Sequence, residues 1–185
     1  MICEHIGYKE IKLIGQSMDD SFGESFDKVS KMLGLGYPGG PIVEKRAKAG
    51  DMNRFPFTVP LSGKKSIEFS FSGLKNSVRL EIEKLGEHIT EQDKNDICAS
   101  FQKCAIKHIL DKCKIYLSSN KIPYFSVVGG ASANQSLRGG FEDLCRQFGT
   151  LPLFVDLAYT SDNAVMVGRC AIDAYAKKDF IQYGK

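Results

Sequence analysis

Residues 122–134 read Ile-Pro-Tyr-Phe-Ser-Val-Val-Gly-Gly-Ala-Ser-Ala-Asn. The apolar run 124–128 predicts a buried strand, which ends at Gly129 and Gly130. Asn134 then opens a predicted helix, because apolar side chains recur on one helical face at Leu137, Phe141, Leu144 and Phe148. A strand, a glycine turn and a helix in this order allow backbone N–H groups to approach a nucleotide closely.

Strands and helices alternate along the rest of the chain, which predicts an α/β layered domain. The other predicted strands cover residues 9–13, 67–71 and 153–155, the second from its strict alternation of apolar and polar residues. The other predicted helices cover 22–33, 41–50, 74–85 and 91–117, with a last helix from Asn163. Thr90 and Asp93 have the spacing of a capping box before the longest helix.

Composition indicates a cytoplasmic domain without membrane contact. The 185 residues suffice for one sizeable core or two small subdomains, and a net charge of +3 is too small to predict nucleic-acid binding by itself. No apolar run has the length of a membrane span. The six cysteines form no Cys-x-x-Cys pair, and three in one predicted helix, Cys98, Cys104 and Cys113, are interpreted as buried reduced thiols.

Polar residues near the predicted turns have alternative interpretations. The Asp27 carboxylate, one helical turn after Gly23, could accept hydrogen bonds from two ribose hydroxyls or could be a solvated acid that pairs with Lys31. Gly39 and Gly40 precede a predicted helix and could face an anion or form a simple Pro-Gly turn.

Two further residues are expected to cap helices. Asn134 is predicted to cap its helix, and its carboxamide could also contact a base or a ribose. Asp162 is predicted to cap the last helix, a role that would explain this residue by itself.

Five segments occur in a characteristic order: Gly-Glu-Ser-Phe-Asp-Lys (23–28), Gly-Tyr-Pro-Gly-Gly-Pro (36–41), Phe-Ser-Phe-Ser-Gly-Leu-Lys (69–75), Val-Val-Gly-Gly-Ala-Ser-Ala-Asn (127–134) and Ser-Asp-Asn-Ala (161–164). Together they resemble the C-terminal part of the TsaD family, the tRNA N6-adenosine threonylcarbamoyltransferases once called glycoproteases. The resemblance implies that residues 1–185 are the C-terminal ribonuclease-H-like subdomain of an actin-like (ASKHA, sugar-kinase/Hsp70 type) fold. A helical insertion would cover about 73–121, and the N-terminal half of the protein would be missing.

The same resemblance implies an activity and a site. The intact enzyme would move the threonylcarbamoyl group from threonylcarbamoyl-AMP to N6 of the adenosine next to the anticodon in tRNA. Asp162 would be one ligand of a divalent metal, iron or alternatively zinc. The substrate nucleotide would be bound by Asp27, Gly40, Glu44, Gly129, Gly130 and Asn134.

Family members also carry a His-x-x-x-His metal pair, which is absent here, since His5, His88 and His108 are widely spaced. The chain alone is therefore expected to be inactive. The implied partners are tRNA and, in bacteria, a paralogous dimer partner and a P-loop ATPase. Two alternatives are an actin-like-fold ATPase or sugar-kinase relative, disfavoured by segments 37–41 and 70–75, and a non-catalytic paralogue that acts as a binding partner, disfavoured by the intact Ser-Asp-Asn turn.

Overall fold

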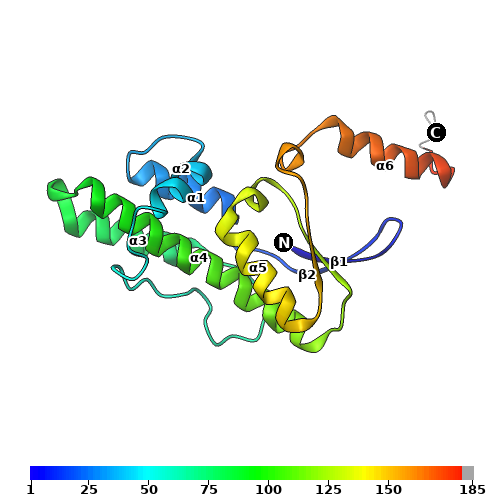
Figure 1. Cartoon of the computed structure of the whole chain (residues 1–185), viewed down its shortest axis with the longest axis horizontal. Helices are drawn as coiled ribbons and strands as arrows, with labels where there is room; N and C mark the ends of the chain where they lie inside the picture. Colours follow the sequence, from blue (N-terminus) through cyan, green and yellow to red (C-terminus); the bar gives the residue numbers. More distant parts are fainter. Residues whose placement is uncertain (181–185) are drawn as a thin grey trace.

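A computed structural model describes residues 1–180 (Figure 1). Its helices are α1 (Phe22–Met32), α2 (Gly39–Ala47), α3 (Ser72–Leu85), α4 (Glu91–Ser119), α5 (Gln135–Phe148) and α6 (Ala164–Ala176). Its strands are β1 (Ile2–Gly7), β2 (Glu10–Gly15), β3 (Tyr124–Val127) and β4 (Leu151–Phe154), and short 3-10 turns are η1 (Gly86–His88), η2 (Gly130–Ala133) and η3 (Leu157–Tyr159). The predicted mixed α/β class is confirmed, whereas the actin-like assignment and the insertion at 73–121 stay predictions.

The long helix α4 is the centre of the fold, and α2, α3 and α5 pack against it (Figure 1). The predicted capping box is confirmed: the Asp93 N–H donates to Thr90 Oγ1 at 3.1 Å, and the Asp93 carboxylate accepts from the Thr90 N–H at 2.7 Å. In the core, the buried rings of Phe101 and Phe26 meet with centroids 4.9 Å apart. Burying one such ring stabilises the fold by roughly 1.5–3 kcal/mol.

Helix α2 begins at Gly39, two residues before the predicted start, and ends at Ala47 instead of 50. Gly39 packs directly on α1, since a Cβ at this position would lie 2.5 Å from Asp27 Cα and 2.6 Å from the Phe26 carbonyl oxygen. Any larger residue would push the two helices apart. Glycine at 39 is therefore required by the close approach of α1 and α2.

The strands form two separate two-stranded sheets in the described part of the chain: β1 is antiparallel to β2, and β3 is parallel to β4. The strand predicted at 9–13 is β2, with Lys9 in the preceding turn at φ 59°, and β1 was not predicted. The strand predicted at 153–155 is β4, starting at Leu151.

Two strand predictions were wrong in part. The run 124–128 does form β3, but it is not buried, since Tyr124 is 60% exposed and β4 is its only neighbour among residues 1–180. Among the described residues, the run 67–71 makes only a single bridge, between Phe69 and Ser17. Its alternating burial arises because Phe69 and Phe71 dock into the helical core, and the Phe71 N–H donates to Asp19 at 2.8 Å just before α3.

Helix α6 extends away from the helical body, and none of its residues is buried (Figure 1). Its N-cap is Asn163, whose Oδ1 accepts from the Val165 and Met166 N–H groups. The prediction that Asp162 caps this helix was wrong, because Asn163 stands one residue closer to the first turn and captures both donors. Within residues 1–180, no helix is long and apolar enough to span a membrane.

The cysteine interpretation is confirmed for the central helix. Cys98, Cys104 and Cys113 of α4 are buried free thiols. Burial raises the pKa of Cys98 and of Cys113 to about 12, so these thiols stay protonated and behave as small apolar core residues.

Candidate nucleotide-binding site

Asp27 occupies the junction of α1 and α2. Its side chain is half-buried, and its Oδ1 accepts the Gly39 N–H at 2.7 Å. Its Oδ2 has no hydrogen-bond partner among residues 1–180, and it makes no ion pair with Lys31 there. The alternative of a solvated acid paired with Lys31 is therefore wrong. Asp27 is an acceptor fixed at a helix N-terminus, where the helix dipole favours negative charge.

Gly40 is the second residue of α2 rather than a residue before it. The N–H of a second helical residue has no partner inside its own helix, and no other partner for it is found in the described part of the chain. A Cβ at Gly40 would meet no atom within 4 Å, so this backbone faces open space. Gly40 can thus offer its N–H to a ligand, while Gly39 has the packing role.

Glu44 connects α2 to α5. Its Oε1 accepts the Gln135 N–H at 2.8 Å, at the first residue of α5. Its second carboxylate oxygen makes no hydrogen bond to any residue that the structure describes. Like Asp27, Glu44 is thus held in place through one oxygen, with the other available.

Asn134 has the predicted capping role. The side chain is only 7% exposed, and its Oδ1 accepts the Leu137 N–H at 2.9 Å. Its Nδ2 donates to Gln102 Oε1 of α4 at 2.9 Å. Gln102 was not predicted from the sequence as a site residue. The sequence feature that could have indicated it is an uncharged polar residue next to Phe101, on the inward side of α4. One N–H of the Asn134 carboxamide remains for a ligand.

The glycine turn between β3 and α5 has an exposed, unusual backbone. Gly129 has φ +84°, in the region that favours glycine, and neither Gly129 nor Gly130 would place a Cβ within 4 Å of another atom. Arg138 of α5 donates to the Ser132 carbonyl in this turn and to the Val155 carbonyl at 2.8 Å. Arg138, a second residue missed from the sequence, therefore ties the turn to the end of β4.

These predicted residues form one cluster. The Asp27–Gly39 bond joins α1 to α2, the Glu44–Gln135 bond joins α2 to α5, and α1 also contacts η2 of the glycine turn. Asp27, Gly40, Glu44 and Asn134 thus lie around one junction of three helices. Their role toward a ligand stays a prediction.

The order of motifs agrees with a comparison of the whole chain. A family model for TsaD, described as tRNA N6-adenosine threonylcarbamoyltransferase, matches residues 3–169. The chain belongs to this family.

Curated proteins with this name have similar sequences. The one from Wolinella succinogenes is 58% identical over 176 residues, which are 95% of this chain and 53% of the relative. The one from Nitratiruptor sp. is 53% identical over 184 residues, which are 97% of this chain and 54% of the relative. One from Helicobacter pylori is 48% identical over 187 aligned positions, which cover 100% of this chain and 55% of the relative. The TsaD chain described here therefore spans about half the length of these relatives.

The residues that the structure describes do not by themselves form the metal site expected from the TsaD resemblance. Asp162 is exposed in the segment between η3 and α6, and its side chain makes no hydrogen bond to a described residue. Residues 1–180 contain no group of three or more His, Cys, Asp or Glu side chains arranged to hold a metal ion. The TsaD chain thus offers one carboxylate, which is not by itself a metal centre.

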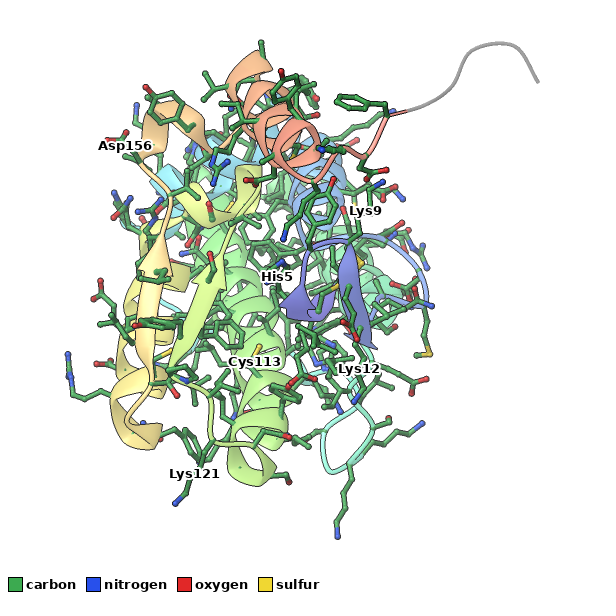
Figure 2. All side chains as sticks on the ribbon, turned by 90° about the vertical axis from the view of Figure 1, so that its right-hand side faces the viewer. His5, Lys9, Lys12, Cys113, Lys121 and Asp156 are labelled. Carbon is green, nitrogen blue, oxygen red and sulfur yellow. The ribbon has the colours of Figure 1, made fainter. Side chains whose placement is uncertain are left out.

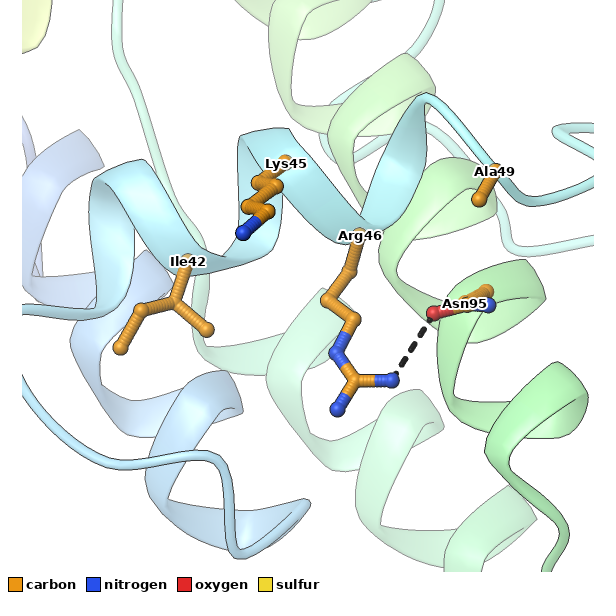
Figure 3. A pocket seen from close by; sticks show the side chains of 5 residues that line it. All are labelled: Ile42, Lys45, Arg46, Ala49 and Asn95. Carbon is orange, nitrogen blue, oxygen red and sulfur yellow. Dashed lines mark hydrogen bonds between the residues drawn. The ribbon is translucent and has the colours of Figure 1, made fainter.

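A shallow open pocket beside α2 is separate from the predicted site. It is lined by Ile42, Lys45, Arg46, Ala49 and Asn95 (Figure 3). Arg46 crosses from α2 to α4, donating to Asn95 Oδ1 at 3.2 Å and to Glu91 at 2.7 Å. Its guanidinium is thus engaged in joining two helices, and the pocket contains none of the predicted site residues.

Proposed function

We propose that this chain supplies the adenylate-binding part of a cytoplasmic tRNA-modifying transferase. The relatives are named for transfer of a threonylcarbamoyl group to N6 of adenosine in tRNA. The proposal adds that threonylcarbamoyl-AMP is the donor and that the acceptor is the adenosine next to the anticodon. The observation that carries the proposal is that the carboxylates of Asp27 and Glu44 share one mode of anchoring. Each is fixed by one backbone N–H, at 2.7 and 2.8 Å, and each keeps one oxygen without a partner among residues 1–180.

The chemistry of adenylate fits this arrangement. A ribose carries two neighbouring hydroxyls, and carboxylate oxygens are strong acceptors for both. Asp27 and Glu44 accept these hydroxyls, and the Gly40 N–H donates to an oxygen of the nucleotide at the positive end of α2. The bare backbone of Gly129 and Gly130 lets the rest of the nucleotide approach closely, and the remaining Asn134 N–H donates to it.

The other components belong to the same proposal. The chain corresponds to the C-terminal ribonuclease-H-like subdomain of an actin-like fold, with residues of about 73–121 as its helical insertion. A divalent iron or zinc ion takes Asp162 as one ligand and its other ligands from outside residues 1–180. The partners are tRNA, a paralogous dimer partner and a P-loop ATPase.

A chimera tests this function. The matched region of the Wolinella succinogenes relative is replaced by this chain, and threonylcarbamoyl transfer from threonylcarbamoyl-AMP to tRNA is measured. We expect an active chimera in which Asp27→Asn raises KM for threonylcarbamoyl-AMP by roughly 10- to 100-fold, the cost of about 1.5–3 kcal/mol for a lost charged hydrogen bond.

The matched control is Asp143→Asn, which removes an exposed acid on α5 that pairs only with Arg146 in the described structure. We expect this variant to keep the KM of the chimera. An inactive chimera, or equal effects of the two substitutions, would contradict the proposal.

A further inference from the structure

Another open pocket lies between the loop of residues 60–65 and the second half of α4. The loop belongs to the segment between α2 and α3, which runs along α4 (Figure 1). Figure 2 shows the loop in pale cyan, with nitrogen-tipped side chains extending from it, beside the half of α4 that carries the labelled Cys113. The pocket has a volume of about 390 Å³ and is lined by all six loop residues and by α4 side chains between His108 and Ser118.

The charge of this pocket is strongly positive. Lys64 and Lys65 of the loop line it together with Lys112, Lys114 and Asp111 of α4. Four positive charges and one negative charge leave +3, which equals the formal net charge of the whole chain. The rest of the sequence therefore has as many acidic as basic side chains, and the pocket alone accounts for the excess positive charge.

Three of the four lysines are available to a ligand. Lys64, Lys65 and Lys114 are exposed and make no ion pair with any residue that the structure describes. The Asp111 carboxylate is engaged by Lys107, one helical turn earlier on α4, at 2.9 Å. The acid in the pocket thus has its own partner, and the three exposed ammonium groups do not depend on it.

Buried Lys112 holds the loop against α4. Its side chain is 2% exposed, and its Nζ donates to the Leu61 carbonyl at 3.1 Å and to the Lys64 carbonyl at 2.8 Å. The loop turns tightly above it, with φ +47° at Leu61 and +77° at Gly63. Glu68 is a further carboxylate near Lys112, but it does not line the pocket. The exposed lysines of the loop are therefore presented from an anchored backbone.

This pocket has the chemistry of a contact with a phosphate backbone. Lysine ammonium groups are compact point charges that attract phosphates without reading a base. No Phe, Tyr or Trp among the described residues lines the pocket, so it offers no ring on which a base can stack. An acidic polypeptide would satisfy the same charges, but the relatives are named for action on tRNA, which carries a phosphate at each nucleotide.

We propose that the loop of residues 60–65 and the second half of α4 bind the phosphate backbone of tRNA, with Lys64, Lys65 and Lys114 as the contacts. The proposal rests on the proposed function, which makes tRNA the substrate, and it assigns the tRNA a surface outside the cluster around Asp27. Because phosphate contacts carry no sequence information, this surface orients the tRNA while the acceptor adenosine is recognised elsewhere.

Binding of fluorescently labelled tRNA to the chain tests the proposal without adenylate or turnover. We expect Lys64→Ala combined with Lys65→Ala to weaken binding by at least about tenfold at about 0.1 M salt. The slope of log K against log salt should become shallower by about 1.4–1.8, since each lost phosphate contact removes roughly 0.7–0.9. Lys64→Arg combined with Lys65→Arg keeps both charges and should retain the affinity.

The matched control is Lys45→Ala combined with Lys48→Ala, which removes two exposed lysines in and just after α2. Lys45 lines the pocket that contains Asn95, and α4 rises about 24 Å from Asn95 to Asp111. We expect the control to bind tRNA within about twofold of the unsubstituted chain. Equal tRNA affinity in the Lys64/Lys65 alanine variant, or an equal loss in the control, would overturn the proposal. Tighter binding of polyglutamate than of tRNA through the same two lysines would also overturn it.

The chimera separates this proposal from the proposed function. Lys64→Ala combined with Lys65→Ala should raise KM for tRNA and leave KM for threonylcarbamoyl-AMP unchanged, whereas Asp27→Asn should do the reverse. A KM for tRNA that does not respond to the lysine substitutions would overturn the tRNA contact. An inactive chimera would contradict the proposed function, while the binding of labelled tRNA to the chain would still decide the role of the lysines.

Discussion

At the scale of single residues, neighbouring positions on α1 have different roles. Phe26 is buried in the core against Phe101, whereas Asp27, one position on, is half-buried and bonded to the Gly39 N–H. Side chains 100° apart on a helix can thus serve packing and binding separately. The two roles can be distinguished by measuring stability.

Phe26→Ala should destabilise the chain by roughly 3–5 kcal/mol, because it leaves a cavity in the core. Asp27→Ala should cost only about 0.5–1.5 kcal/mol, the net contribution of one hydrogen bond. Urea unfolding of both variants measures the difference. Similar losses for the two variants would mean that Asp27 is chiefly a structural residue.

His108 should make stability depend on pH. Its side chain is fully buried, its Nε2 accepts the Ser70 N–H at 3.2 Å, and burial, with a smaller effect from Lys112, lowers its pKa from 6.5 to about 4. Between about pH 4 and pH 6.5, the unfolded state therefore binds more protons than the folded state. The contribution of neutral His108 to the free energy of unfolding is complete above pH 6.5. It is lost as the pH falls to about 4, which lowers the free energy of unfolding by up to roughly 3 kcal/mol.

Unfolding measured in urea from about pH 7 to about pH 4 checks this expectation. His108→Gln keeps an acceptor for Ser70 but does not titrate, so its stability should vary less over this range. Parallel pH profiles for the two proteins would show that His108 is not the group responsible.

At the scale of elements, the N-terminus of α5 is set by two side chains from other parts of the fold. Asn134 caps it and is anchored by Gln102 of α4, while Glu44 of α2 accepts the Gln135 N–H. The start of this helix therefore depends on tertiary contacts as well as on its own residues.

Asn134→Ala should lower stability by about 0.5–2 kcal/mol, the usual cost of a lost N-cap. Asn134→Ser should recover most of this loss, because serine can accept the Leu137 N–H. Thermal unfolding of the two variants checks the expectation. Serine as damaging as alanine would show that the bond to Gln102, and not the cap, is the important contact.

The elements that could be predicted from the sequence are those that depend on local features of the chain. Helices α1, α3, α4 and α5 were predictable because their apolar faces and caps are local in sequence. The exposure of β3 and the failure of 67–71 to form a strand were not, because strand burial and pairing depend on which other strands are present. Asp162 was mistaken for a cap because adjacent Asp and Asn residues have equal capping preference, and only backbone geometry selects Asn163.

The candidate site was predictable only in part. The residue types near each turn follow from local chemistry, but the family resemblance was needed to favour Asp27 as a binding residue. Gln102 and Arg138 could not be found, because their partners, Asn134 and the Val155 carbonyl, are distant in sequence or presented by a turn. Only the fold shows that α1, α2 and α5 bring these groups together.

At the scale of the whole molecule, the nucleotide contacts and the metal ligand that the TsaD resemblance implies lie in different surroundings. The predicted nucleotide contacts cluster at one helix junction, whereas residues 1–180 contain no group of three or more His, Cys, Asp or Glu side chains that could hold a metal ion with Asp162. We therefore expect the purified chain to retain no stoichiometric iron or zinc after dialysis and to show no transfer to tRNA. Elemental analysis and a transfer assay check both points, and a stoichiometric metal retained after dialysis would contradict the first expectation.

Calorimetric titration of AMP into the chimera tests the central claim most directly, because it measures adenylate binding without requiring turnover. The account predicts that Asp27→Asn weakens AMP binding by roughly 10- to 100-fold while the free energy of unfolding changes by less than about 1.5 kcal/mol. Unchanged AMP affinity in this variant, with the protein folded, would contradict the assignment of Asp27 to the nucleotide.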